Sequence, residues 1–494
     1  MENKRKNPRQ LFYAVFSFAL LALCLFSCKT EPSPENGSAD AKTQTAAQEE
    51  PEEIPVKQDR YDTSFILGQI SELLEKGDYE EALARFSGIK AEDAEKVEIR
   101  LLKASALISA GKYSDARAIV NEVLENNPDH IPALFVLSSI EEAQNRTREQ
   151  RAALERILAK ESGNVQALVA MGTLLIRGSA ARQAGPYFDR ALAADPQNGE
   201  ALLGRAWVYR NARDVKNAEA LLNRAVELYP DWARACHERG RLYKAAGFYQ
   251  AALADLNKAQ ALDGNNYFIA CDKADALKSL NRKKEALAEY ERAIAINPDY
   301  FLAYVFSGSL KDELGDLDGA FKDYQALVRL NPDYYFGFEG LGMHLMRLSR
   351  WLEARDAFME AYRRASLADS ASPDLGMYAL LASVCALRGG ARREAQPFMD
   401  KALAKLARDS LEYRMLRLYR DWAGDMDITN RIDRERNPLV KSRMLFYLAW
   451  YYEIRGNKNL ANKFFLQVRD LDVKNMIEWR LNEWILDARG MEKK

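Results

Sequence analysis

Residues 233–266 read ARACHERGRLYKAAGFYQAALADLNKAQALDGNN, and the pattern of this stretch recurs along most of the 494-residue chain. Small residues stand at Gly240 and Ala252, and glycines that break helices stand at Gly247 and Gly264. At intervals of 34 residues, the place of Gly264 is taken by Pro128, Ser162, Pro196, Pro230, Pro298 and Pro332. The place of Gly240 is taken by Ala104, Ser138, Gly172, Ala206, Ala274 and Gly308. Such self-similarity at a fixed period is typical of stacked helical repeats.

Each recurring column has a physical meaning. Proline cannot extend a helix, so it is expected to close the second helix of each unit. The aspartate after it, as in Pro128-Asp129 and Pro230-Asp231, is expected to cap the next helix. The small columns allow two antiparallel helices to approach closely. Glycine breakers lie between the paired helices at Gly77, Gly111, Gly247 and Gly315. The sequence therefore predicts units of helix, tight turn and helix.

This pattern resembles the tetratricopeptide repeat (TPR), a 34-residue helix hairpin with small, aromatic and proline columns. In repeat 335–368 the matching residues are Leu341, Gly342, Trp351, Ala354, Phe358 and Ala361. The resemblance covers roughly residues 61–475. It implies an all-α fold: a right-handed α-solenoid of about 11–12 stacked hairpins, with a capping helix at the C-terminus.

The phase of the pattern predicts the domain organisation. Nine in-phase repeats are expected within 61–368, the first starting at residue 63. The phase then slips by seven residues, and further TPR-like repeats are expected within 369–475: 376–409, a degenerate 410–441 and 442–475. Residues 476–494 are predicted as a capping helix and tail. Its apolar face is expected to hold Ile477, Leu481, Trp484, Ile485 and Ala488, with Glu478, Arg480, Glu483 and Asp487 off that face.

The amino terminus has the features of an export signal. Basic residues precede an apolar run from Leu11 to Ser27, and Cys28 follows directly. This arrangement resembles a bacterial lipobox, which implies that 1–27 are a signal peptide and that Cys28 carries a diacylglycerol anchor. The alternative is an uncleaved anchor helix, although 17 residues is short for spanning a bilayer. Residues 28–60 contain few large apolar side chains, and we expect this segment to be a disordered linker.

Composition and motifs indicate a binding protein. The 71 Lys and Arg residues nearly balance 72 Asp and Glu, and this excludes the strong basic excess of a nucleic-acid binder. Only three histidines are present, and no nucleophile or phosphate-loop motif accompanies them. We therefore predict no enzyme, no cofactor and no metal site. Cys236, Cys271 and Cys385 are expected to be free thiols, although a Cys236–Cys271 bridge is geometrically conceivable.

The TPR resemblance also implies where a ligand would bind, because the first helices of such repeats line a concave groove. Matched by position, the early repeats contribute a mainly apolar lining: Leu101, Ser105, Ile108, Phe135, Ser139, Val169, Thr173 and Ile176. The central repeats contribute the candidate ligand groove: Trp207, Arg210, Asn211, Arg234, His237, Arg241, Lys244, Asp272 and Asp275. Asp312, Glu313 and Glu339 then extend the acidic stretch, before Met343, Met346 and Met377.

The candidate groove departs from the TPR type that clamps a peptide carboxylate with Lys and Asn. His237 and Arg241 stand at the first clamp positions, and Asp272 stands where a second Asn would be. The basic residues could instead bind an acidic segment, because arginine forms bidentate bonds to carboxylates. Asp272 and Asp275, one turn apart, could ligate a cation, although solvated groove residues are the favoured interpretation.

These observations predict a lipid-anchored TPR scaffold or adaptor that mediates protein–protein interactions in the bacterial cell envelope. It would lie on the non-cytoplasmic side of a membrane, with the outer membrane slightly favoured. Its partner would be an extended protein segment or an envelope component. The alternative is an accessory protein of a transport or cell-wall system that binds a small or polymeric ligand in the groove.

Overall fold

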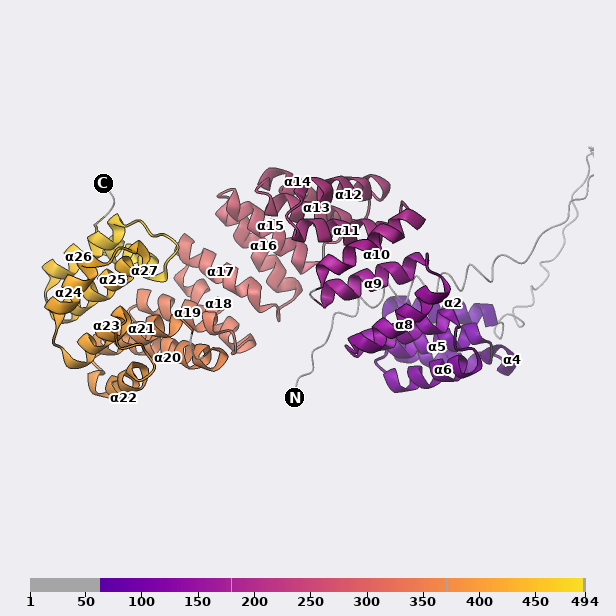
Figure 1. Cartoon of the computed structure of the whole chain (residues 1–494), viewed down its shortest axis with the longest axis horizontal. Helices are drawn as coiled ribbons and strands as arrows, with labels where there is room; N and C mark the ends of the chain where they lie inside the picture. The colour runs from indigo at the N-terminus through magenta and orange to yellow at the C-terminus, as the bar shows by residue number, and fades with distance from the viewer. Residues whose placement is uncertain (1–62, 179, 370–371, 492–494) are drawn as a thin grey trace, which may run out of the picture. The chain divides into compact units, whose positions relative to one another are not determined.

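The computed structural model describes residues 63–178, 180–369 and 372–491, and the regular structure in these ranges is helical. The chain divides into two compact units, Met1–Pro230 and Asp231–Lys494, which we call unit 1 and unit 2 (Figure 1). The predicted all-α fold of consecutive hairpins is confirmed, with twelve hairpins followed by a single helix in the described residues.

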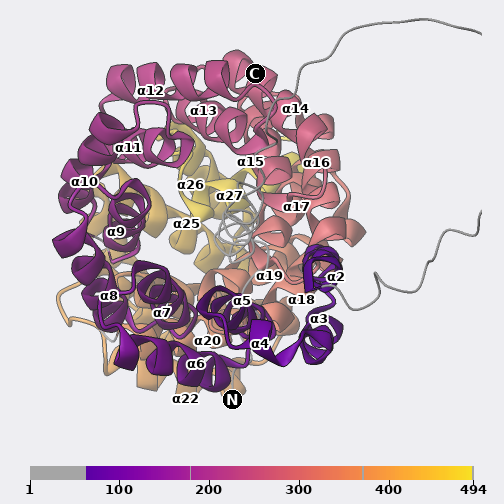
Figure 2. The same cartoon turned by 90° about the vertical axis from the view of Figure 1, so that its right-hand side faces the viewer.

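The described part of unit 1 holds five hairpins, with short helical segments after the first of them. Its elements are α2 (Thr63–Lys76), α3 (Tyr79–Arg85), η2 (Phe86–Gly88), α4 (Ala91–Ala94), α5 (Val97–Ser109), α6 (Tyr113–Asn126), α7 (Ile131–Ala143), α8 (Thr147–Lys160), α9 (Val165–Arg177), α10 (Ala181–Ala194), α11 (Gly199–Asn211) and α12 (Val215–Leu228). The first helices α5, α7 and α9 lie on the inner side of an arc, and α6, α8 and α10 lie on its outer side (Figure 2).

Among the residues of unit 2 that the structure describes, seven hairpins are followed by one further helix. Its elements are α13 (Ala233–Ala245), α14 (Tyr249–Leu262), α15 (Tyr267–Ser279), α16 (Lys283–Ile296), α17 (Phe301–Leu314), α18 (Leu317–Leu330), α19 (Tyr335–Arg347), α20 (Trp351–Ala368), α21 (Asp374–Arg388), α22 (Arg392–Leu403), α23 (Leu411–Asp421), α24 (Asp425–Arg434), α25 (Pro438–Ile454), α26 (Lys458–Asp470) and α27 (Ile477–Ala488).

In most of the described hairpins, the turn holds a residue in the left-handed conformation. Gly77, Gly111, Gly247 and Gly315 have φ between +75° and +85°, which glycine adopts without steric cost. Asn145, Arg213, Asn281 and Ser349 adopt the same conformation at the equivalent place in other repeats. The turn geometry is therefore imposed by the packing of the two helices, even where a side chain makes it less favourable.

The small-residue column faces large side chains. A Cβ built on Gly172 of α9 would lie 2.6 Å from Cζ of Phe188 on α10, and one built on Gly240 of α13 would lie 2.9 Å from Leu256 on α14. Gly204 of α11 faces the same Phe188 ring. The column that contains Gly172 and Gly240 must be small, because the second helix packs a ring or a branched side chain against it. That side chain comes sixteen residues later in the sequence.

The expected aspartate caps are wrong. The N-cap of α7 is His130, whose Nδ1 accepts from the Ala133 amide at 3.2 Å, and the N-cap of α13 is Trp232. Asp129 instead donates its own amide to Asn127 Oδ1 within the turn. After these prolines, the helix begins one residue later than predicted.

The last third of unit 2 departs from the regular array. Thirteen successive residues of α21, Leu375–Leu387, are buried, and most of α25 between Ser442 and Tyr451 is buried as well. A helix that is buried on every side lies at the centre of a core. One continuous apolar cluster runs from Met343 to Leu486, whereas the clusters of earlier repeats are small and local. This part of the chain therefore has a larger continuous core than the earlier repeats.

Candidate functional site

The first-helix face of unit 1 is less open than expected. Leu101, Ser105, Ile108 and Phe135 are at most 8% exposed and belong to the packing between repeats. Val169, Thr173 and Ile176 on α9 keep partly or fully exposed side chains. The predicted apolar lining is therefore wrong for α5 and for Phe135 on α7, because neighbouring helices cover those side chains.

Three candidate residues of unit 1 lie on α11. Trp207 is half-buried and packs against the core around Leu168 and Phe188. Arg210 is partly exposed, and Asn211 at the end of the helix is exposed. The remaining six candidates belong to unit 2.

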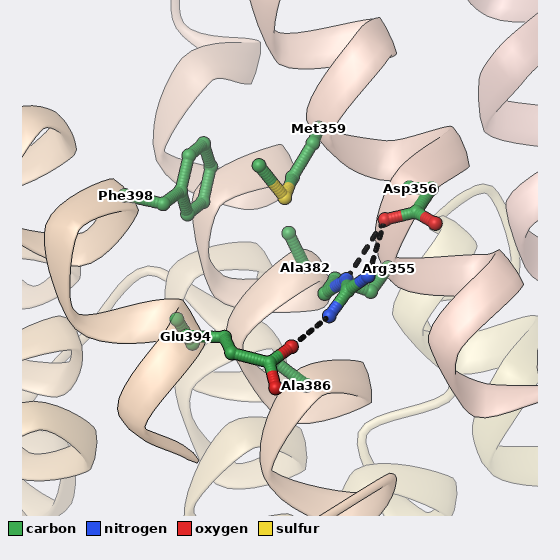
Figure 3. Close-up of a pocket in the computed structure, with 8 residues that line it drawn as sticks. Arg355, Asp356, Met359, Ala382, Ala386, Glu394 and Phe398 are labelled. Atoms are coloured by element: carbon green, nitrogen blue, oxygen red, sulfur yellow. Dashed lines mark hydrogen bonds and ion pairs between the residues drawn. The ribbon is translucent and has the colours of Figure 1, made fainter. Parts of the chain in front are cut away.

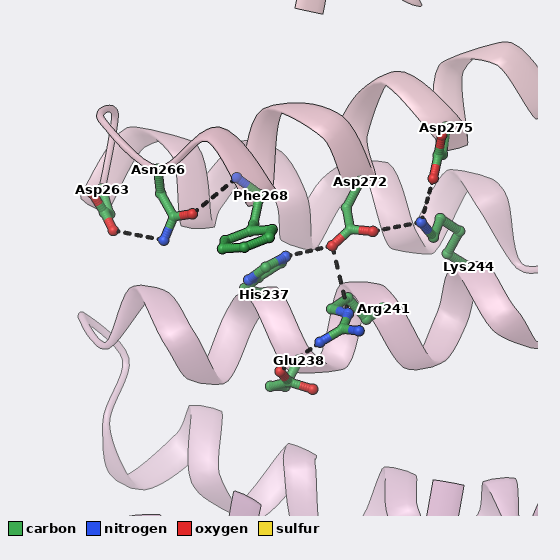
Figure 4. Close-up of polar contacts among 9 residues, drawn as sticks. All are labelled: His237, Glu238, Arg241, Lys244, Asp263, Asn266, Phe268, Asp272 and Asp275. Atoms are coloured by element: carbon green, nitrogen blue, oxygen red, sulfur yellow. Dashed lines mark hydrogen bonds and ion pairs between the residues drawn. The ribbon is translucent and has the colours of Figure 1, made fainter. Parts of the chain in front are cut away.

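Five candidates of unit 2 form one charged cluster across α13 and α15, which we call the charge ladder: His237, Arg241, Lys244, Asp272 and Asp275 (Figure 4). His237 Nε2 lies 2.7 Å from Asp272 Oδ2, and Lys244 Nζ donates to Asp272 Oδ1 at 2.5 Å. Lys244 Nζ also donates to Asp275 Oδ2 at 2.7 Å. The two first helices are therefore joined by complementary charges.

Arg241 is the most accessible member of the charge ladder, with a side chain 42% exposed. Its Nη1 donates to Glu238 Oε1 at 3.0 Å, and its Nε lies 3.5 Å from Asp272 Oδ2. The sixth candidate, Arg234, is exposed on the first turn of α13, with its guanidinium 6.0 Å from the centre of the Trp232 ring.

The pKa values reflect this pairing. Burial alone would raise the pKa of the Asp272 carboxyl, but contacts with His237 and Lys244 outweigh burial and lower it to about 2. Burial would lower the pKa of the Lys244 ammonium, and the carboxylates of Asp272 and Asp275 outweigh it and raise that pKa. Asp272 and Lys244 are therefore both charged at neutral pH, and each stabilises the charged form of the other.

Asp275 has a further contact on its outer oxygen. The hydroxyl of Tyr290 on α16 donates to Asp275 Oδ1 at 2.5 Å, and Tyr290 is fully buried. Burial and this carboxylate raise the pKa of Tyr290 above its ordinary value. Asp275 is thus shared between the core of its own hairpin and the charge ladder.

The carboxylate of Asp272 occupies the place that an acidic ligand would take beside His237 and Lys244. An incoming carboxylate must compete with it, so the inner part of the ladder is already satisfied within the protein. The outer part, around Arg241 and Arg234, remains accessible to solvent. Within the described ranges, no group of three or more His, Cys, Asp or Glu side chains could hold a metal ion.

The acidic stretch predicted beyond Asp275 is mostly not a groove. Asp312 is 4% exposed, and its carboxylate accepts from Tyr324 Oη at 2.9 Å and lies 2.7 Å from His344 Nδ1. Met343, Met346 and Met377 are also buried. The predictions for Asp312 and the three methionines are wrong, because neighbouring helices cover these positions, whereas the side chain of Glu313 is 39% exposed. Sequence reasoning missed the Asp312–His344 pair, whose two members lie on the adjacent first helices α17 and α19.

A hollow lies between α20, α21 and α22 (Figure 3). Met359, Ala382, Ala386 and Phe398 form its apolar part. Arg355 lies at its rim, 2.8 Å from Asp356 and 3.4 Å from Glu394. Its single cation is neutralised by two carboxylates, so the hollow offers no strong polar anchor.

Two predictions about cysteines have different outcomes. Cys236, Cys271 and Cys385 are free thiols, as predicted. Burial, with the nearby Asp275 and Asp272, raises the pKa of the Cys271 thiol to about 12. Cys28, the predicted lipidation site, lies outside the described residues. Within the described part of the chain, no helix combines the length and apolar character that crossing a bilayer requires.

Family models described as "Tetratricopeptide repeat" match residues 73–137, 175–237, 233–266 and 271–335. These matches agree with the hairpins and the small, turn and proline columns. The chain is a tetratricopeptide repeat protein. Arrays of this kind act as scaffolds that present extended surfaces to other proteins, and no catalytic family is among the matching models. No curated protein matches the chain.

Several solved TPR structures are similar to parts of this TPR protein. A TPR protein from Parabacteroides merdae shares 18% identity over 50% of this chain and 98% of its own, with a TM-score of 0.42. PilW, described as a type IV pilus biogenesis factor, shares 21% identity over 42% of this chain and 95% of its own (TM-score 0.38). YrrB, described as a TPR protein with an unusual peptide-binding site, shares 21% identity over 36% and 91% (TM-score 0.32).

Proposed function

We propose that this TPR protein is a non-enzymatic scaffold that binds an extended segment of a partner protein across α13 and α15. The observation that carries the proposal is the charge ladder, in which five polar side chains from two adjacent first helices form one connected surface. Charged side chains that contact one another across helices fix their positions, so the surface is ordered before a partner arrives.

The accessible charges define the partner segment. Arg241 and Arg234 face solvent on α13, and both can form charge-assisted hydrogen bonds with carboxylates. The side chain of Asp275, 36% exposed, offers a carboxylate to a cation. The complementary segment therefore carries acidic residues opposite α13 and a basic residue opposite α15. A uniformly acidic segment would be repelled by Asp272 and Asp275.

The test is charge reversal followed by co-purification. Partners are crosslinked in cells, and recovery is compared between the wild-type chain and a variant with Arg234→Glu and Arg241→Glu. We expect loss of the partners that bind this face. Arg282→Glu is the control, since Arg282 is also exposed but pairs with Glu285 within its own turn. Unchanged recovery of partners with the double variant would contradict the proposed site.

We further propose that the scaffold is lipid-anchored through Cys28 on the non-cytoplasmic side of a bacterial membrane, with the outer membrane slightly favoured. The supporting observations are the basic residues, the apolar run and the cysteine in residues 1–28. Metabolic labelling with a radioactive or alkyne palmitate should label the wild-type chain and not Cys28→Ser. Equal labelling of both chains, or none of either, contradicts the anchor. An uncleaved N-terminus, detected by mass spectrometry, indicates the anchor-helix alternative.

A further inference from the structure

The final helix α27 packs beyond the end of the array. A capping helix needs to cover only the last hairpin, yet α27 contacts α19 as well as α25 and α26. Arg347 of α19 lies 4.8 Å from the centre of the Trp484 ring on α27. Three hairpins separate α19 from α27 in the sequence, so α27 lies across a surface built from distant parts of unit 2.

The buried side of α27 differs from the predicted apolar face. Glu478 is 0% exposed, so its predicted place off the buried face is wrong. Leu481, Asn482 and Leu486 complete the buried stripe, at the spacing of one helix face. Two of these four buried positions are polar. A helix that served only as hydrophobic cover would place apolar residues there.

The surface beneath α27 has groups that recognise this stripe. The carboxylate of Glu478 accepts from Tyr447 Oη at 3.1 Å and lies 3.0 Å from Arg443 Nε, both on α25. Asn482 Nδ2 donates to the carbonyl of Phe465 at 3.0 Å. Arg469 Nε donates to Glu483 Oε1 at 2.8 Å. These contacts specify a register and an acidic residue, which is characteristic of helix-in-groove recognition.

The fit of α27 is incomplete. Glu478 Oε2 and Asn482 Oδ1 are buried without a hydrogen-bond partner, and a buried polar atom of this kind weakens the docking. Burial also raises the pKa of the Glu478 carboxyl, although Arg443 and Tyr447 favour its charged form. A helix that supplied the same apolar contacts with better-satisfied polar groups would bind the surface more tightly than α27 does.

We propose that the surface formed by α19, α25 and α26 binds an amphipathic helix of a partner protein, and that α27 occupies it in the absence of the partner. The partner helix carries a carboxylate at the place of Glu478 and aliphatic residues three and eight positions later. The charge of Arg443 and the hydrogen bond from Tyr447 select this helix over a basic or wholly apolar one. This inference extends the proposed scaffold function to a second surface and rests on it.

The experiment measures binding of a fluorescent peptide of residues 474–491 to full-length chains by anisotropy. In the wild-type chain α27 competes with the peptide, so binding should be weak. Leu481→Asp in the chain weakens docking of α27 but leaves the groove intact, and we expect at least tenfold tighter peptide binding. A peptide with Glu478→Ala should bind at least tenfold more weakly. Arg443→Met, added to the Leu481→Asp chain, should weaken binding of the unaltered peptide.

Hydrogen exchange and circular dichroism define the outcomes. If the amides of α27 exchange rapidly in Leu481→Asp and the peptide still does not bind, the proposal that this surface binds a helix is contradicted. The milder Glu478→Ala chain replaces Leu481→Asp if that variant unfolds. If α27 stays protected from exchange in both variants, α27 does not leave the surface and the proposal fails. If the chain forms a concentration-dependent dimer that the peptide dissociates, the surface is occupied by a second copy of the chain instead of a partner protein. None of these failures affects the charge-reversal test of α13 and α15.

Discussion

Asp272→Asn tests whether the charge ladder holds α13 against α15. The Asp272 side chain is 17% exposed and faces His237, Arg241 and Lys244. Its pKa is lowered from 3.8 to about 2. Each pKa unit corresponds to about 1.4 kcal/mol, so ionised Asp272 contributes about 2 kcal/mol to the stability of unit 2.

The sign of the pH dependence follows from the lowered pKa. An acid whose pKa is lower in the folded state stabilises that state above its unfolded pKa of 3.8. The contribution is lost as pH falls from 3.8 through about 2, where the carboxyl becomes protonated in both states. The asparagine variant lacks this titration. Wild type and Asp272→Asn should therefore differ at pH 7 and converge near pH 2.

The assay is urea unfolding at pH 7, 4 and 2.5, with hydrogen exchange to report α13 and α15 separately. Asp318→Asn is the control, because Asp318 is exposed on α18 and a surface change of this kind alters stability by about 0.5 kcal/mol or less. If Asp272→Asn lowers the free energy of unfolding at pH 7 by less than about 0.5 kcal/mol, the estimated contribution of ionised Asp272 is refuted. A loss that persists unchanged at pH 2.5 would show that the charge of Asp272 is not its source.

Three further predictions concern packing, turns and thiols. Gly172→Ala should destabilise unit 1 by about 1–2 kcal/mol in urea, because the new methyl group would lie 2.6 Å from Phe188 Cζ. Gly68→Ala, on the exposed side of α2 with no atom within 4 Å, should instead stabilise by about 0.5–1 kcal/mol, and a loss at both sites would contradict the packing argument. Arg213→Gly should stabilise by about 0.5 kcal/mol because Arg213 has φ +62°, while Arg213→Ala, which keeps the Cβ, should give no gain. Cys271 and Cys385 should resist iodoacetamide at pH 8 because burial raises the pKa of both thiols, and mass spectrometry should find both alkylated in urea; rapid labelling of the folded chain would refute this.

The candidate site shows where sequence reasoning reached its limit. Matching positions between repeats selected His237, Arg241, Lys244, Asp272 and Asp275, which the structure brings together. The same rule selected Asp312 and Met343, which are buried. The rule assumes that every first helix keeps an open face. That assumption fails where other helices cover the first-helix face: Tyr324 and His344 contact Asp312, and Met343 lies in the large apolar cluster that includes residues of α21, α25 and α27.

The 34-residue period was sufficient for the hairpin fold because its causes are local. Proline ends a helix, a left-handed residue makes the turn, and a small residue such as Gly172 admits a ring sixteen positions later. Each of these effects acts within one repeat or between neighbouring repeats, so the spacing of residues in the sequence predicts it. The contact between Arg347 on α19 and Trp484 on α27 has no such spacing, because three hairpins separate the two helices in the sequence. It depends on how α27 packs back against α19 within unit 2, and contacts of that kind are decided by the packing of the assembled helices.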